Sequence, residues 1–449
     1  MWLSAARRVS FSLSGIKDMK KLLILVSVLG LLGTACGTIA PQPKLETPPI
    51  GTVFAGGPDE ESLGKSKGYP LPSHREAFQR EEHLVSSYSG GRENLCPHHI
   101  VKKGPAPTPL AKADRPTLFG YTLDGRRYNS DDYLKRQRVM GLLVIKDGRI
   151  VLERYQYNRD ESSRFQSESM AKSVTALLVG IAIAEGHIKS VDDLAKQYVP
   201  ELVDHPYGET SIRHLLQMSS GVKFSEDYTG SDDTAILSRG SAGNLGPGGV
   251  STVMPFRNNE RIYEPGKKFQ YASSETQVLG LVLRQAIGKS LADYLSEKIW
   301  QPMGAESDAS WNIDKSGQEA AYICLGATLR DFGRLGMLLA NDGVANGKQI
   351  VPKEWGREAT QPTPGYPHLK PGVATPYMGY GYQFWVFPGS NRRFALQGMR
   401  GQAIFVDPEL KLVMVQTAVW KGYRHPENAR EHGERDALWR GIVATYGSW

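Results

Sequence analysis

The chain has few cysteines, a short apolar run and no cluster of basic side chains, and each shortage narrows its possible functions. Only three of its 449 residues are cysteine. The apolar run from Leu22 to Leu32 is too short to span a bilayer comfortably. The formal net charge is +7, but Lys and Arg gather only in short pairs such as Arg126-Arg127, so no nucleic-acid partner is expected.

Metal ligands are also scarce. His98 and His99 are adjacent, but no carboxylate or cysteine follows them at ligand spacing, so they are interpreted as surface residues. No metal and no cofactor is predicted. Cys96 and Cys324 could pair in an oxidising compartment, although two independent thiols are the preferred interpretation.

What the chain does have is the composition of a globular protein, with 40% hydrophobic and 22% charged residues. Its length allows two or three domains or a single large two-part fold. The stretch 37–115 is rich in Pro, Gly and Ser with little periodicity, which predicts an extended tether and a wrapping arm. The remaining residues, 116–449, are expected to form one folded domain that carries the motifs described below.

The first 36 residues have the pattern of an export signal. Met19-Lys20-Lys21 precedes the apolar run, and small residues then lead to Cys36. This anatomy resembles a bacterial lipoprotein signal with Cys36 as the lipidated residue. It predicts a cell-envelope or periplasmic protein held at the membrane by a lipid anchor. Leu32 stands four rather than three residues before Cys36, so cleavage and secretion without lipid remains an alternative.

The most informative motif is Ser169-Met170-Ala171-Lys172, followed about a hundred residues later by Tyr271-Ala272-Ser273. A lysine three residues after a serine lies one helical turn away and can reach its hydroxyl. A serine needs such a neighbour to remove its proton before it becomes a useful nucleophile. Tyr271 is the candidate to share proton transfer.

The context of Ser169 separates it from other Ser-x-x-Lys sequences in the chain. It precedes the apolar stretch from Val174 to Ile183, which predicts a buried helix. A serine at the first turn of that helix lies beside unpaired backbone N–H groups, which favour the negative charge of acyl transfer. The alternative is that Ser169 only caps the helix.

Several further motifs accompany these residues and together resemble the serine beta-lactamase-like family. They are Ile212 to Gly221, Glu264 to Tyr271, Gly326 to Asp331, Gly401-Gln402 and Val406-Asp407-Pro408. The resemblance covers roughly Arg138 to Ala418 and is closest to class C enzymes, related esterases and 6-aminohexanoate-dimer hydrolases. It implies an α+β, beta-lactamase/transpeptidase-like fold, with an antiparallel sheet lobe flanked by helices and an inserted mainly helical lobe.

The chain departs from the class C pattern at two places. Ser273 stands where class C enzymes carry Asn, as it does in the aminohexanoate-hydrolase branch, and the usual Lys-Thr-Gly motif reads Leu396-Gln397-Gly398. The resemblance implies that the N–H groups of Ser169 and Met399, the latter just after Gly398, form the oxyanion hole. The missing cationic side chain argues against an efficient beta-lactamase or D-alanyl-D-alanine peptidase, although Arg400 is close enough in sequence to replace it. An amide or ester hydrolase is favoured instead.

Strand and helix patterns agree with this architecture. Val139 to Tyr155 predicts a hairpin around Asp147-Gly148, and the sheet is expected to be completed by 381–386, 394–396 with 402–406, and 411–419. Helices are predicted after Thr210 and Thr328.

Two more residues are supporting candidates. Tyr228 lies in the loop after Gly221, where the aminohexanoate-hydrolase branch has a tyrosine that assists the leaving amine; a wall or structural role is the alternative. Ser273 is expected to hydrogen-bond Lys172, or else a turn backbone. His214 and Glu275 are interpreted as structural, so no Ser-His-Asp triad is predicted.

The sequence therefore predicts a serine hydrolase that cleaves a small-molecule amide or ester through an acyl-enzyme, with Ser169, Lys172 and Tyr271 as catalytic residues. Two alternatives stay open. One is a penicillin-interacting beta-lactamase or D-alanyl-D-alanine carboxypeptidase, and the other is a non-catalytic envelope binding protein.

Overall fold

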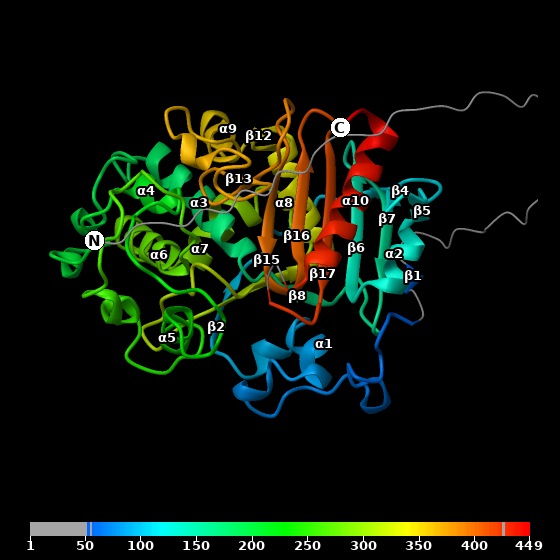
Figure 1. The fold of residues 1–449 in the computed structure, drawn as a ribbon, viewed down its shortest axis with the longest axis horizontal. Coiled ribbons are helices and arrows are strands. Elements are labelled where there is room, and N and C mark those ends of the chain that lie inside the picture. The colour runs from blue at the N-terminus through cyan, green and yellow to red at the C-terminus, as the bar shows by residue number, and fades with distance from the viewer. Residues whose placement is uncertain (1–51, 54–55, 424–426) are drawn as a thin grey trace, which may run out of the picture. The chain divides into compact units, whose positions relative to one another are not determined.

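The computed structural model describes residues 52–53, 56–423 and 427–449 (Figure 1). The expected export signal, Cys36 and the first part of the tether lie outside these residues. No helix within the described ranges combines the length and the apolar character needed to cross a membrane.

One large sheet organises the chain. Its strands run in the order β1-β7-β6-β17-β16-β15-β14-β13, and β3 also pairs with β7. Pairing is antiparallel except where β1 and β3 lie parallel to β7. The bounds are β1 Thr52–Val53, β3 Ala111–Lys112, β6 Val139–Lys146, β7 Arg149–Tyr155, β13 Gly379–Tyr380, β14 Trp385–Val386, β15 Phe394–Gly398, β16 Gln402–Asp407 and β17 Leu412–Ala418.

The two faces of this sheet are covered by different helices because successive side chains of a strand point to opposite faces. Ile404 of β16 packs with α8 (Leu329–Ala340), whereas Phe405 contacts Trp439 of α10 (Ala429–Tyr446), at 5.6 Å between ring centroids. A side chain at Gly336 of α8 would come within 2.5 Å of Val413, so the glycine permits close packing. Figure 1 shows α10 running along the sheet.

A second, four-stranded sheet joins the expected arm to the rest of the fold. Its order is β2-β9-β10-β8, and β2 belongs to the segment expected as the arm. That segment also contains the short helix α1 (Leu84–Ser87). The bounds of the strands are β2 His98–Val101, β8 Arg164–Gln166, β9 Ala309–Asn312 and β10 Leu325–Thr328. The arm therefore contributes strands to both sheets; its boundary at residue 115 stays a prediction.

Helices dominate the segment inserted between the strands of the large sheet, seen on the left of Figure 1. They include α3 Met170–Ala184, α4 Ile212–Leu216, α5 Asp233–Gly240, α6 Ser273–Ile287 and α7 Leu291–Leu295. The same segment also holds α9 Lys353–Ala359 and the hairpin of β11 Val344–Ala345 with β12 Lys348–Gln349. Before it come the hairpin of β4 Gly120–Leu123 with β5 Arg126–Asn129, and α2 Ser130–Arg136.

Local expectations are mostly confirmed. Asp147 and Gly148 both have positive φ, 49° and 75°, as a type I′ hairpin requires. Thr328 caps α8 by accepting from the Asp331 amide. The single strand expected over 381–386 is wrong: the chain turns there between β13 and β14. Gln383 has φ 65°, and its side chain donates to the Leu215 and Leu216 carbonyls, which holds the turn.

Candidate active site

Ser169 lies at the N-terminal end of α3, where its hydroxyl faces Lys172. The distance from Lys172 Nζ to Ser169 Oγ is 2.9 Å. The Ser169 side chain makes no capping hydrogen bond, and its φ and ψ of −65° and −5° are helical rather than those of a typical cap. Ser169 therefore occupies the N-cap position of α3 without capping the helix through its side chain.

The Lys172 amine is held in a buried position. Lys172 is 1% exposed, and it also donates to the Tyr322 carbonyl at 3.3 Å. Burial lowers the pKa of Lys172 to about 8, although Glu226 and Glu168 act in the opposite direction. At pH 7 roughly a tenth of the amines are then neutral and able to accept a proton.

The ring of Tyr271 lies next to the same amine. Its ring centroid lies 4.9 Å from Lys172 Nζ. Burial and Glu226 raise the pKa of Tyr271 far above its usual value, while a hydrogen bond with Ser169 acts to lower it. Tyr271 is therefore a neutral phenol at physiological pH, suited to relay a proton. Its ring stacks on Trp385 at 5.7 Å, and Tyr380 meets it edge-on at 6.3 Å.

The strand that carries the altered third motif approaches the serine turn closely. A side chain at Gly398 would come within 2.5 Å of the Ser167 carbonyl, so glycine is needed there. Met399 therefore begins beside the turn that presents Ser169. Arg400 is not available as a substitute cation, because its guanidinium donates to the Trp420 and Lys421 carbonyls and to Gln79.

Ser273 has a different partner from the one expected. Its hydroxyl and its amide both donate to Glu226, each at 2.8 Å, rather than to Lys172. The Tyr228 hydroxyl also donates to Glu226, at 2.8 Å, and its ring stacks on Tyr423. The Glu226 carboxylate accepts all three of these donors, and charge-assisted hydrogen bonds are the stronger ones.

Sequence reasoning missed Glu226, although it singled out the Ser225 to Tyr228 loop. The available signal was the carboxylate two residues before Tyr228. Glu168 was also missed. It is 1% exposed, has φ 45° and forms an ion pair with Arg92 at 2.8 Å. A positive φ in a residue other than glycine, placed directly before Ser169, marks a constrained turn.

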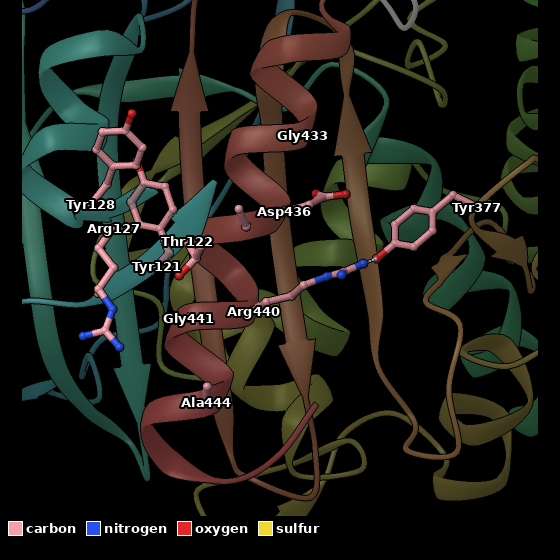
Figure 2. Close-up of a pocket in the computed structure, with 12 residues that line it drawn as sticks. Tyr121, Thr122, Arg127, Tyr128, Tyr377, Gly433, Asp436, Arg440, Gly441 and Ala444 are labelled. Atoms are coloured by element: carbon pink, nitrogen blue, oxygen red, sulfur yellow. Dashed lines mark hydrogen bonds between the residues drawn. The ribbon is translucent and has the colours of Figure 1, made fainter. Parts of the chain in front are cut away.

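A separate hollow of about 770 Å³ lies between α10 and the β4–β5 hairpin (Figure 2). Tyr121 and Tyr128 line one side, and Arg440 donates to the Tyr377 hydroxyl on the other. None of the expected site residues lines it. This hollow is therefore not part of the candidate site at Ser169.

This fold brings the buried Ser169 and Lys172 together with the partly buried Tyr271. The comparisons that follow support a serine hydrolase of the amide or ester type. A family model described as Beta-lactamase matches residues 131–437. The chain belongs to the Beta-lactamase family.

Individual relatives agree. The 6-aminohexanoate-dimer hydrolase of Paenarthrobacter ureafaciens is 26% identical over 305 residues, which are 66% of this chain and 76% of that protein. A solved structure from Bacillus anthracis that carries the name of a 6-aminohexanoate-dimer hydrolase has a TM-score of 0.71 at 24% identity, covering 82% of this chain and 96% of that one. A family VIII carboxylesterase structure has a TM-score of 0.51 at 18% identity, covering 68% and 93%. The two structures show likeness of fold.

Proposed function

We propose that Ser169 attacks the carbonyl of a small linear amide or ester and forms an acyl-enzyme, with Lys172 as the base. The observation that carries this proposal is the buried Lys172 amine, 2.9 Å from Ser169 Oγ, whose pKa is lowered to about 8. The distance fits both protonation states: the ammonium donates to the hydroxyl, and the neutral amine accepts from it.

The steps follow from this geometry. The neutral Lys172 amine takes the Ser169 proton as Oγ bonds to the carbonyl carbon. The backbone amides of Ser169 and Met399 stabilise the oxyanion, each contributing roughly 3 kcal/mol by comparison with similar sites. The proton passes through the neutral phenol of Tyr271 to the leaving nitrogen or oxygen. Water then attacks the acyl-enzyme by the reverse proton path and frees Ser169.

The third motif supports the choice of substrate class. Gln397 stands where the family offers a hydroxyl next to a cation, and its side chain is held by Met378 and Arg435. With the Arg400 guanidinium also occupied, the described strand offers little to bind the carboxylate of a penicillin. The named relatives include a 6-aminohexanoate-dimer hydrolase and a carboxylesterase, which supports linear amides and esters instead.

The decisive experiment compares the purified protein with Ser169→Ala. Both are treated with a fluorophosphonate and with p-nitrophenyl esters and linear amides, and adduct mass and initial rates are measured. We expect one adduct on Ser169 and turnover in the wild type only. A folded wild type that is inert to all probes contradicts the proposal. Strong labelling by a fluorescent penicillin would shift the substrate class to beta-lactams.

We also propose that the protein is exported and lipidated on Cys36. The support is the signal-like sequence before that cysteine. Expression of the full chain and of Cys36→Ala with radiolabelled palmitate, followed by cell fractionation, tests it. Label and membrane association should disappear in the variant; a wild type without label contradicts lipidation.

A further inference from the structure

We propose that Arg92, supplied by the arm that precedes the matched family region, is a positioning residue for acylation because it fixes both sides of the Ser169–Lys172 pair. Arg92 lies in a 3₁₀ turn, Gly91–Asn94, outside residues 131–437. Its side chain is only 7% exposed. The proposal rests on Ser169 being the nucleophile.

The first contact of Arg92 is with the residue directly before the nucleophile. Arg92 Nη1 lies 2.8 Å from Glu168 Oε1, and the Glu168 side chain is 1% exposed. Glu168 has φ 45°, a conformation that needs support from its surroundings in a residue other than glycine. The orientation of Glu168 determines where the Ser169 amide points, and that amide is one of the two proposed oxyanion donors.

The second contact is with the segment that receives the lysine. Arg92 Nη1 is 3.3 Å from Cys324 Sγ, and Cys324 also has a positive φ, 64°. Two residues earlier, the Tyr322 carbonyl accepts from Lys172 Nζ. One guanidinium therefore contacts the serine turn and the turn beside the lysine. Neither contact involves a catalytic group, so Arg92 acts through its neighbours.

The arm is tied to this region by further bonds. The Arg92 guanidinium lies over the Tyr88 ring at 4.7 Å, and the Tyr88 carbonyl accepts from the Gln166 amide of β8 at 3.0 Å. Strand β8 leads into the serine turn. The arm is therefore hydrogen-bonded to the strand that precedes Ser169, which gives the arm a structural route to the reaction beyond covering the surface.

Charge gives the proposal a specific signature. Glu168 raises the pKa of Lys172, whereas burial, the main cause, lowers it, and Glu226 acts with Glu168. The positive charge of Arg92 offsets the negative charge of Glu168 in their ion pair. The ionisable groups that face Glu168 are Arg92, Lys172, Cys324, Tyr88 and Tyr228. Without Arg92, the negative charge of Glu168 acts on Lys172 unopposed and favours its ammonium form.

The test uses Arg92→Met, the double variant Arg92→Met/Glu168→Gln, and Glu93→Gln as the matched control. Glu93 is the next residue of the arm and pairs with Arg164 and Ser310, so its variant removes a contact between the arm and the domain without touching Glu168. Rates on a p-nitrophenyl ester are expressed per site titrated with fluorophosphonate, from pH 5 to 10.

We expect kcat of Arg92→Met to fall at least ten-fold with KM within two-fold, and its acid limb to move to higher pH. The double variant buries no unpaired charge and is expected to fold. Its kcat should stay low while its acid limb returns to the wild-type position or below. Glu93→Gln should keep wild-type kcat and profile.

The proposal is overturned if either folded Arg92 variant keeps kcat within two-fold of wild type, or if the acid limb of Arg92→Met does not move. It is also overturned if Glu93→Gln loses as much kcat as Arg92→Met. Should Arg92→Met not fold, the double variant carries the kcat test. Failure of the proposed function is a separate result, because the wild type itself would then take no label.

Discussion

The two sides of the Ser169 hydroxyl are built in different ways. Lys172 reaches it from the same turn of one helix, so their 2.9 Å separation follows from helical geometry. Tyr271 and Glu226 reach the lysine from separate segments of the chain, and their places depend on how loops pack. In the proposed mechanism, the local side, Ser169 with Lys172, supplies the nucleophile and the base. The assembled side, Tyr271 with Glu226, adjusts proton transfer. Substitutions on the two sides should therefore differ in kind as well as in size.

The largest effect is expected on the local side, from Lys172→Met. Loss of the base should reduce acylation about 10³-fold. The free energy of unfolding of the variant should also rise, by on the order of 1–3 kcal/mol. The reason is that a buried amine with a lowered pKa is replaced by an apolar side chain of similar length. Ester turnover and thermal unfolding measure both. An unfolding temperature below that of the wild type would contradict the account of Lys172 burial.

On the assembled side, Tyr271→Phe should reduce acylation roughly 10²-fold. The hydroxyl that relays the proton is lost, while the ring that packs between Lys172 and Trp385 remains. Tyr228→Phe is the comparison, since its hydroxyl donates to Glu226. Tyr228→Phe should lower the acylation rate less than ten-fold with esters. The loss should be larger with amides, because their poorer leaving group needs protonation. Equal losses on both substrates would favour a wall role for Tyr228.

The sequence predicts the local side well because its rules are local. Ser169, Lys172 and the buried α3 follow from spacing and apolar periodicity, and Asp147-Gly148 specifies its own turn. The same reasoning fails for Ser273, whose partner Glu226 comes from a loop 47 residues away. No sequence periodicity predicts the contact between Ser273 and Glu226, because it depends on how loops of the inserted lobe pack.

Arg92 shows the same limit more strongly. It lies in a segment poor in periodicity, where Pro and Gly predict a tether. Its ion pair with Glu168 joins residues 76 positions apart, and the signal for it appears only once Glu168 is seen with positive φ and buried.

Gly398→Ala tests the junction between the two sides. The added methyl group would meet the Ser167 carbonyl at 2.5 Å, so β15 must move away from the serine turn and carry the Met399 amide with it. A displacement of about 1 Å at such a donor is expected to lower kcat by a factor between about 10 and 10². Gly433→Ala in α10 is the control, since no atom lies within 4 Å of its added group. Wild-type kcat in folded Gly398→Ala would remove Met399 from the oxyanion hole.

The smallest effect, and the one that best separates the two sides, is a pH shift in Glu226→Gln. Glu226 raises the pKa of Lys172, so removing its charge lets burial lower that pKa further below about 8. In the proposed mechanism the neutral amine is the reactive form, so the acid limb of kcat/KM should move to lower pH. The rate at pH 7 should rise, or otherwise stay within ten-fold of the wild-type rate. Glu260→Gln, an exposed charge change in the same lobe, should leave the limb in place. A shift of the Glu226→Gln limb to higher pH would mean that the carboxylate supports proton transfer by holding Ser273 and Tyr228, an effect that then outweighs its field at Lys172.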